Sequence, residues 1–274
     1  MDARSALVEG YNRSAPIYDQ TAGMTYVQAL RSLLPRVLVG PFPAVLDLGC
    51  GTGINLLEAA RVLGPCRRLH GIDLAPGMIH EARRKAASAG VPASFEVGDA
   101  QDLALEDASF DLVLCNSVYH WFPDRSRAVA EMSRVLRPGG QLLLNCIADP
   151  NFHEWVRVVD DVRRALLHDE RSWLPPLPTP SELMGHLRAA RLAVEHLEYQ
   201  VDSIPVHDVG AFLRTMAVIA PTWLAGAPDG ARGLVSAVTK ALSAGNAGPF
   251  LITSAGMASI SRKPIVLLDG EDTP

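Results

Sequence analysis

The chain has 274 residues, of which 48% are hydrophobic and 20% are charged, and its formal net charge at pH 7 is −5. This composition is that of an ordinary globular protein, and the length suits one large domain or a domain with a substantial appendage. An acidic chain without a basic run disfavours a nucleic-acid partner, and the lack of a long apolar stretch predicts no membrane span and a cytoplasmic location.

Short apolar runs alternate with helix-period segments from residue 44 onward. The runs that we expect to form strands are AVLDLG (44–49), RRLHGIDL (67–74), ASFEVGD (93–99), FDLVLCNS (110–117) and QLLLNCIA (141–148). Between them, apolar residues recur at helical spacing over 54–63, 78–89 and 128–136. This alternation predicts a mostly parallel sheet with helices on both faces.

The rhythm changes after residue 148. A helix-like segment, a proline-rich stretch and a further helix fill 149–191, which we interpret as an insertion over the strand ends. A sixth strand is expected at 192–201, helices at 207–220 and 229–243, and a seventh strand at 250–263. We therefore predict a helical cap (1–40), a core (41–148), a helical lid (149–191), strands and helices that complete the sheet (192–264) and a disordered tail (265–274).

The stretch LDLGCGTG (46–53) raises the question of which ligand needs such a close approach of the backbone. A strand, a glycine loop and a helix bring bare backbone to a ligand, and dinucleotide folds use the spacing G-x-G-x-x-G for pyrophosphate. The glycines here, Gly49, Gly51 and Gly53, are spaced more tightly, and Asp47 precedes them. A carboxylate at that strand end suits a cation, whereas Asp73 at the next strand end suits the hydroxyls of a ribose.

These motifs resemble those of class I S-adenosylmethionine-dependent methyltransferases that act on small molecules. VLDLGCGTG (45–53), GIDLAPGMI (71–79), GDAQDL (98–103), FDLVLCNSVYHWFPD (110–124) and LRPGG (136–140) match the family's motifs in order and spacing. The resemblance implies an α/β fold: a Rossmann-like, seven-stranded, mostly parallel sheet whose last strand is antiparallel, with a helical lid. It also implies S-adenosylmethionine as the cofactor and no metal.

Ten residues are predicted to bind the cofactor. In the family pattern Asp73 binds the ribose, Leu74 and Met78 pack on the adenine, Asp99 binds its amino group, and Ala100 gives a backbone contact. The other predicted contacts are Tyr18 in the upstream segment YNRSAPIYDQ (11–20), Asp47, Gly49 and Gly51 of the glycine loop, and Asn116. For several of these an ordinary role remains open: Asp47 as a loop cap, Asp99 as a turn residue, and Leu74 and Met78 as core residues.

The substrate side is less specific in sequence. His120 is the candidate general base, with helix capping or pocket shaping as its alternative role, and Tyr11, Tyr119 and His153 are assigned to the substrate. Residues 116–124 are similar to trans-aconitate and malonyl-carrier-protein methyltransferases, which methylate carboxylates, but His120 replaces their glutamine and favours a hydroxyl or amine. The wide spacing of Cys50, Cys66, Cys115 and Cys146 is typical of reduced thiols.

The expected function is methyl transfer to a hydroxyl, amine or carboxylate of a hydrophobic small molecule, in bacterial natural-product biosynthesis. The main alternative is an enzyme of the same fold that uses bound S-adenosylmethionine for other chemistry, such as a cyclisation. A nicotinamide oxidoreductase or a noncatalytic partner protein is a third interpretation. The sequence leaves the oligomeric state open, with a homo-oligomer as one alternative.

Overall fold

The computed structural model of the protein describes residues 3–37, 40, 43–244 and 249–265. Its strands are β1 (Ala44–Leu48), β2 (Arg68–Asp73), β3 (Ser94–Val97), β4 (Phe110–Asn116), β5 (Leu136–Ile147), β6 (Ala193–Val206) and β7 (Phe250–Arg262). Its α-helices are α1 (Ala3–Ser14), α2 (Met24–Leu33), α3 (Ile54–Leu63), α4 (Pro76–Ala89), α5 (Arg125–Val135), α6 (His153–Leu167), α7 (Pro180–Ala189), α8 (Val209–Ile219) and α9 (Arg232–Ser243). Short helical turns are η1 (Ala15–Ile17), η2 (Asp19–Gly23), η3 (Leu34–Arg36), η4 (Tyr119–Trp121), η5 (Pro221–Leu224) and η6 (Asp229–Ala231).

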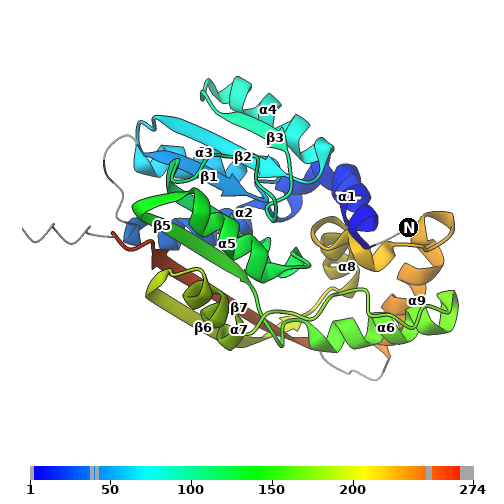
Figure 1. Ribbon diagram of the computed structural model, residues 1–274. Helices are drawn as coiled ribbons and strands as arrows, with labels where there is room; N and C mark the ends of the chain where they lie inside the picture. Colours follow the sequence, from blue (N-terminus) through cyan, green and yellow to red (C-terminus); the bar gives the residue numbers. More distant parts are fainter. Residues whose placement is uncertain (1–2, 38–39, 41–42, 245–248, 266–274) are drawn as a thin grey trace, which may run out of the picture.

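The described residues form one seven-stranded sheet in the order β3-β2-β1-β4-β5-β7-β6 (Figure 1). Strands β1 to β5 are parallel, whereas β7 is antiparallel to both of its neighbours, β5 and β6. This confirms the predicted Rossmann-like α/β fold with an antiparallel last strand. The strand order reverses between β1 and β4, and ligands of such sheets bind outside the carboxyl ends of the strands at this point.

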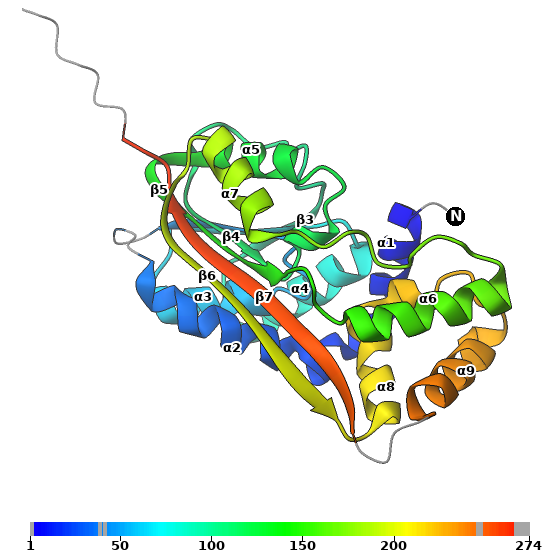
Figure 2. The same ribbon diagram turned by 90° about the horizontal axis from the view of Figure 1, so that it is seen from below.

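Successive residues of the central strands point to opposite faces of the sheet, and a different layer of helices covers each face. Val45 and Leu112 pack against α2, α3 and α4, whereas Leu46 and Val113 pack against α5 and α7. Figures 1 and 2 show these helices on opposite faces of the sheet. Because both faces are covered, the strands are apolar throughout rather than alternating, which is why the sequence pattern identified them.

Local signals set the ends of the helices that flank the candidate site. Pro76 occupies the first turn of α4, and the helix ends at Gly90 in a left-handed conformation (φ 65°). The side chain of Asp124 accepts a hydrogen bond from the amide of Arg127 (2.9 Å) at the start of α5. A side-chain cap of this kind stabilises a helix by about 1 kcal/mol. These caps place the first turns of α4 and α5 at the edge of the sheet where the strands end.

The lid differs from its predicted boundaries. Helices α6, α8 and α9, with η5, form a separate apolar cluster around Trp155, Leu213, Trp223 and Val238, seen at one end of the molecule in Figure 2. Helix α7, which was assigned to the lid (149–191), packs on the core instead, since Leu183 and Leu187 are buried there. We use "lid" below for α6, the loop 168–179, α8, η5 and α9.

The start of β5 also differs from its predicted position, and most of the predicted tail lies outside the described residues. Residues 136–140, expected as a turn before the fifth strand, belong to β5, with a register shift between the pairs Phe110–Leu136 and Leu112–Gln141. The predicted disordered tail (265–274) lies outside the described residues from position 266 onward. Among the described helices, none is both long and apolar enough to span a bilayer.

Candidate functional site

A cavity of about 580 Å³ lies where β1, β2 and β4 end. The loop after β1 contributes Gly49 to its lining, the last residues of β2 and β4 contribute Asp73 and Asn116, and α1 contributes Tyr11. The lid closes another side through residues such as Trp173. The cavity therefore lies between the core, the N-terminal segment and the lid, at the place where an open α/β sheet binds its ligands.

The glycine loop leaves an open space on the cavity floor. Gly49, Gly51 and Gly53 have positive φ angles of 64°, 52° and 76°. A side chain at Gly49 would come within 2.4 Å of Val118, whereas one at Gly51 would meet no atom within 4 Å. Gly49 is thus required for packing, and the missing side chain of Gly51 leaves the backbone open to a ligand.

Asp73 ties the glycine loop to the end of β2. One carboxylate oxygen accepts a hydrogen bond from the amide of Gly51 (2.9 Å), and the other accepts one from the amide of Ala75 (2.8 Å). Burial raises the pKa of Asp73, and these two hydrogen bonds oppose the shift. Each oxygen keeps a second lone pair. The side chain lines the cavity, so it can accept hydrogen bonds from two neighbouring hydroxyls.

Asp47 lies behind the loop and is only 1% exposed. Neither of its carboxylate oxygens makes a hydrogen bond of ordinary geometry among the described residues, although the backbone of Leu56 acts to lower its pKa. Burial, together with the charge of Asp73, raises the pKa of Asp47 well above its usual value. Asn55, which lines the cavity, also has a buried carbonyl oxygen without a partner. Buried acceptors without donors are costly, so this end of the cavity fits a ligand that brings a positive charge or donors.

The turn after β3 brings Ala100 to the cavity wall, together with Gly98 and Gln101. Asp99 is not among the lining residues; it pairs with Arg4 of α1 (2.9 Å) and accepts hydrogen bonds from the amide and side chain of Gln101. Burial would raise the pKa of Asp99, but these hydrogen bonds and the charge of Arg4 hold it below its usual value. Asp99 is therefore ionised at neutral pH.

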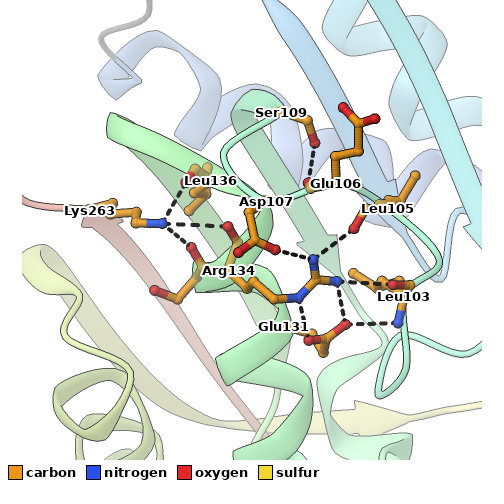
Figure 3. Close-up of polar contacts among 10 residues, drawn as sticks. Leu103, Leu105, Glu106, Asp107, Ser109, Glu131, Arg134, Leu136 and Lys263 are labelled. Carbon is orange, nitrogen blue, oxygen red and sulfur yellow. Dashed lines mark hydrogen bonds and ion pairs between the residues drawn. The ribbon is translucent and has the colours of Figure 1, made fainter.

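A polar network anchors the connection between β3 and β4 (Figure 3). Arg134 of α5 donates to the carbonyls of Leu103 (3.0 Å) and Leu105 (2.7 Å) and pairs with Asp107. Glu131, one turn earlier, accepts from the amide of Leu103 (2.8 Å). No local sequence pattern marks this network, because tertiary contacts join its members. It fixes the chain that leads from Ala100 to β4.

The N-terminal segment (α1, η1 and η2) covers one side of the cavity. Hydrogen bonds attach it both to the lid and to the core. The hydroxyl of Tyr11 donates to the carbonyl of Ile219 in α8 (2.9 Å), and the ring of Tyr11 lies 6.2 Å from that of Tyr18. Asn12 accepts from the amide of Gly77 at the start of α4 (2.7 Å). Both tyrosines line the cavity, as the sequence had indicated.

Asp19 gives the segment a second attachment to the core. It accepts a hydrogen bond from Thr52 of the glycine loop (2.5 Å) and pairs with Lys85 of α4. Neither Thr52 nor Lys85 was singled out from sequence.

Three residues assigned to the substrate side lie away from the cavity wall. The turn η4 directs His120 into the interior, where burial and the charge of Arg125 lower its pKa to about 3. Tyr119 is buried, and its hydroxyl lies 2.8 Å from Nδ1 of His186. His153 is half exposed at the start of α6. These positions give the assigned roles no geometric support.

The structure places Trp121 on the wall where His120 had been expected, because successive residues of η4 point in different directions. Its ring lies 6.3 Å from that of Tyr11. Asn116 does line the cavity, as predicted, and its side-chain carbonyl accepts from Asn145 (2.9 Å).

Arg125, at the first residue of α5, joins the core to the lid loop. It pairs with Glu182 (2.9 Å) and donates to the carbonyls of His120 and Pro176. Its side chain is 13% exposed and lines the cavity beside Trp173 and Pro176. Arg125 was not expected at the site, because the sequence around it does not distinguish it from the other arginines of α5.

Comparisons with known proteins agree with this geometry. A family model described as a methyltransferase domain matches residues 46–144. The malonyl-[acyl-carrier protein] O-methyltransferase of Serratia marcescens is 30% identical over 238 residues, which cover 85% of this chain and 84% of that protein. Nocamycin O-methyltransferase of Saccharothrix syringae is 37% identical over 149 residues, which cover 53% of this chain and 52% of that protein.

Among solved structures, the [4+2]-cyclase SpnF has a TM-score of 0.65 and 19% identity, and the match covers 97% of this chain and 98% of that chain. At this identity the likeness shows the fold alone. The matches with the first three curated relatives span 52%, 36% and 39% of those proteins' lengths.

Proposed function

Since the chain belongs to the class I S-adenosylmethionine-dependent methyltransferases, we propose that it transfers the methyl group of S-adenosylmethionine to a small apolar molecule. The observation that carries the proposal is the open backbone at Gly51, whose amide is bonded to Asp73 on the cavity floor. A ligand with a ribose, an apolar ring and a positive charge fits the groups gathered there.

The residues that would hold the cofactor lie on the core side of the cavity. Asp73 would accept from the ribose hydroxyls, while Leu74 and Met78 would pack against the adenine. Asp47 and Asn55 supply acceptors without partners, which suit an ammonium group. Asp99 would accept from the adenine amino group in place of Arg4, which pairs with it here.

S-adenosylmethionine supplies a methyl carbon that is already activated by the sulfonium. The protein then has mainly to align the acceptor atom and to exclude water, and alignment of this kind lowers a barrier by about 7–11 kcal/mol. Tyr11, Trp121 and Trp173 give the cavity wall three aromatic side chains. This wall supports a small apolar acceptor, and the name of the Saccharothrix relative supports a molecule of the class of nocamycin and transfer to oxygen. We place the reaction in bacterial natural-product biosynthesis.

Calorimetric titration with S-adenosylhomocysteine, with NADH in parallel, tests the proposal. We expect the former to bind and the latter to show no heat. Acceptors are then screened for incorporation of an isotopically labelled methyl group. A product with a new ring and no label would instead support the alternative, in which the bound cofactor assists a cyclisation. Binding of NADH alone would contradict both.

A further inference from the structure

The lid side of the cavity carries three polar groups that lack partners among the described residues. They are Nε of Arg125, Nε1 of Trp173 and the hydroxyl of Thr222, and all three side chains line the cavity. Guanidinium and indole nitrogens are donors only, and a threonine hydroxyl can donate. A buried donor without an acceptor costs free energy, so this wall fits a ligand rich in oxygen acceptors.

The two sides of the cavity are thus opposite in polarity. On the glycine-loop side, among the described residues, the side-chain carbonyl of Asn55 is an unpartnered acceptor on the cavity wall, and the buried carboxylate of Asp47 lies behind that wall. On the lid side the unpartnered groups are donors, and one of them belongs to the guanidinium of Arg125. Arg125 has one ionic partner, Glu182, which is itself 33% exposed. An ammonium group beside this arginine would be repelled, whereas a carboxylate would gain charge-assisted hydrogen bonds.

The cavity wall also lacks a group suited to remove a proton from an acceptor. Among the described lining residues there is no histidine, lysine or glutamate, and the one aspartate, Asp73, is bonded to the glycine loop. His120 lies off the wall. An alcohol or an ammonium acceptor would need such a base. A carboxylate needs none, since it is ionised well below neutral pH.

Resting on the proposed function, we infer that the acceptor is the carboxylate of an apolar molecule, held by Arg125, Trp173 and Thr222. Hydrogen bonds to one carboxylate oxygen leave the other free to attack. That oxygen forms the new bond to the methyl carbon as the carbon–sulfur bond breaks, and the electron pair stays on sulfur. The products are a neutral ester and a neutral thioether, and no proton is transferred.

Three probes that differ only in their polar group test this inference. The protein is saturated with S-adenosylhomocysteine and titrated with cinnamate, cinnamamide and cinnamylammonium. We expect cinnamate to bind about tenfold more tightly than cinnamamide, because hydrogen bonds between charged partners are roughly twice as strong as neutral ones. Cinnamylammonium should bind weakest. Equal affinities, tighter binding of the amide or the ammonium, or no binding of cinnamate would overturn the inference.

Two variants test whether Arg125 and Thr222 cause the preference for cinnamate over cinnamamide. Arg125→Met should abolish the tenfold preference, and Arg127→Met is the control, since Arg127 is exposed on the same helix and pairs with Asp102 instead. Because Arg125 also holds the lid loop, Thr222→Val serves as a second variant that keeps shape and removes one donor. It should weaken cinnamate about threefold and leave cinnamamide less affected.

Different results would refute the proposed function and the carboxylate assignment. Absence of S-adenosylhomocysteine binding would refute the proposed function. Retained binding of that ligand without a preference for cinnamate, or with a preference that survives both Arg125→Met and Thr222→Val, would refute only the carboxylate assignment.

Discussion

Asp47 lies in an environment that should cost the ligand-free protein stability. Its carboxylate is 1% exposed, makes no hydrogen bond of ordinary geometry among the described residues and lies near the charge of Asp73, and the backbone of Leu56 offsets these effects on its pKa only in part. An unsatisfied buried polar group costs about 1–3 kcal/mol, and a charged one more. Asp47→Asn removes the charge and keeps the shape. We expect it to stabilise the ligand-free protein by about 1–2 kcal/mol, which raises the melting temperature by about 4 °C for a chain of this size.

The pH dependence of this effect has a definite sign. Because burial raises the pKa of Asp47 in the folded state, the folded protein keeps a proton over a pH range in which the unfolded chain has lost it. Wild-type stability is therefore greatest below the unfolded pKa of about 4 and falls as pH rises toward the folded value. The advantage of Asp47→Asn should grow between pH 5 and pH 8, and binding of S-adenosylhomocysteine should weaken about tenfold.

Thermal unfolding at several pH values, with and without S-adenosylhomocysteine, measures both effects. Asp111→Asn is the matched control. Burial would raise the pKa of Asp111, but hydrogen bonds from the amide of Ala44 and from Arg137 hold it below its usual value. This variant should therefore lose stability at pH 7 and bind the ligand normally. An unchanged or lower melting temperature for Asp47→Asn at pH 8 would refute the reasoning, as it would show that the carboxylate has a stabilising partner.

Three further predictions concern the loop and the buried histidine. Asp73→Ala should weaken S-adenosylhomocysteine binding by about a hundredfold in calorimetry, since two hydrogen bonds to a charged group are each worth about 1.5–3 kcal/mol; retained micromolar affinity would remove Asp73 from the site. Gly49→Ala should unfold at a clearly lower temperature because its methyl group meets Val118, whereas Gly51→Ala should keep most of the stability and lose ligand affinity; the reverse order would contradict the loop geometry. Turnover should show no inflection between pH 5.5 and 8 from His120, whose pKa is lowered to about 3; a limb near pH 6.5 that disappears in His120→Asn would restore it as a base.

The fold was predictable because its determinants are local. The strands of the core are short apolar runs, and each of them is found within two residues of its expected start, except β5. Strands β6 and β7 pair with each other over their whole length. Residues 202–205 of β6 are exposed and include Pro205, so no apolar alternation marks how far β6 extends.

The candidate site was predictable where a local motif marks the residue. Gly49, Asp73 and Ala100 lie at or shortly after the ends of strands, Tyr11 and Tyr18 lie in the upstream segment, and all five line the cavity. His120 was expected on the cavity wall, but its neighbour Trp121 lies there instead. No pattern in the sequence shows which residue of a single helical turn faces the cavity. Arg125 and Thr222 come from distant segments, and only the tertiary fold brings them to one wall.

The N-terminal segment explains how a site without a base on its wall can still control the reaction. Two adjacent residues of α1 bind different parts of the molecule, Tyr11 to Ile219 in α8 and Asn12 to Gly77 at α4. Opening this segment would therefore expose the cofactor side and the acceptor side together. Water excluded from both sides strengthens the polar contacts that orient the reacting groups. If the acceptor arrives already ionised, alignment under this shared cover is the main contribution that the protein has to make.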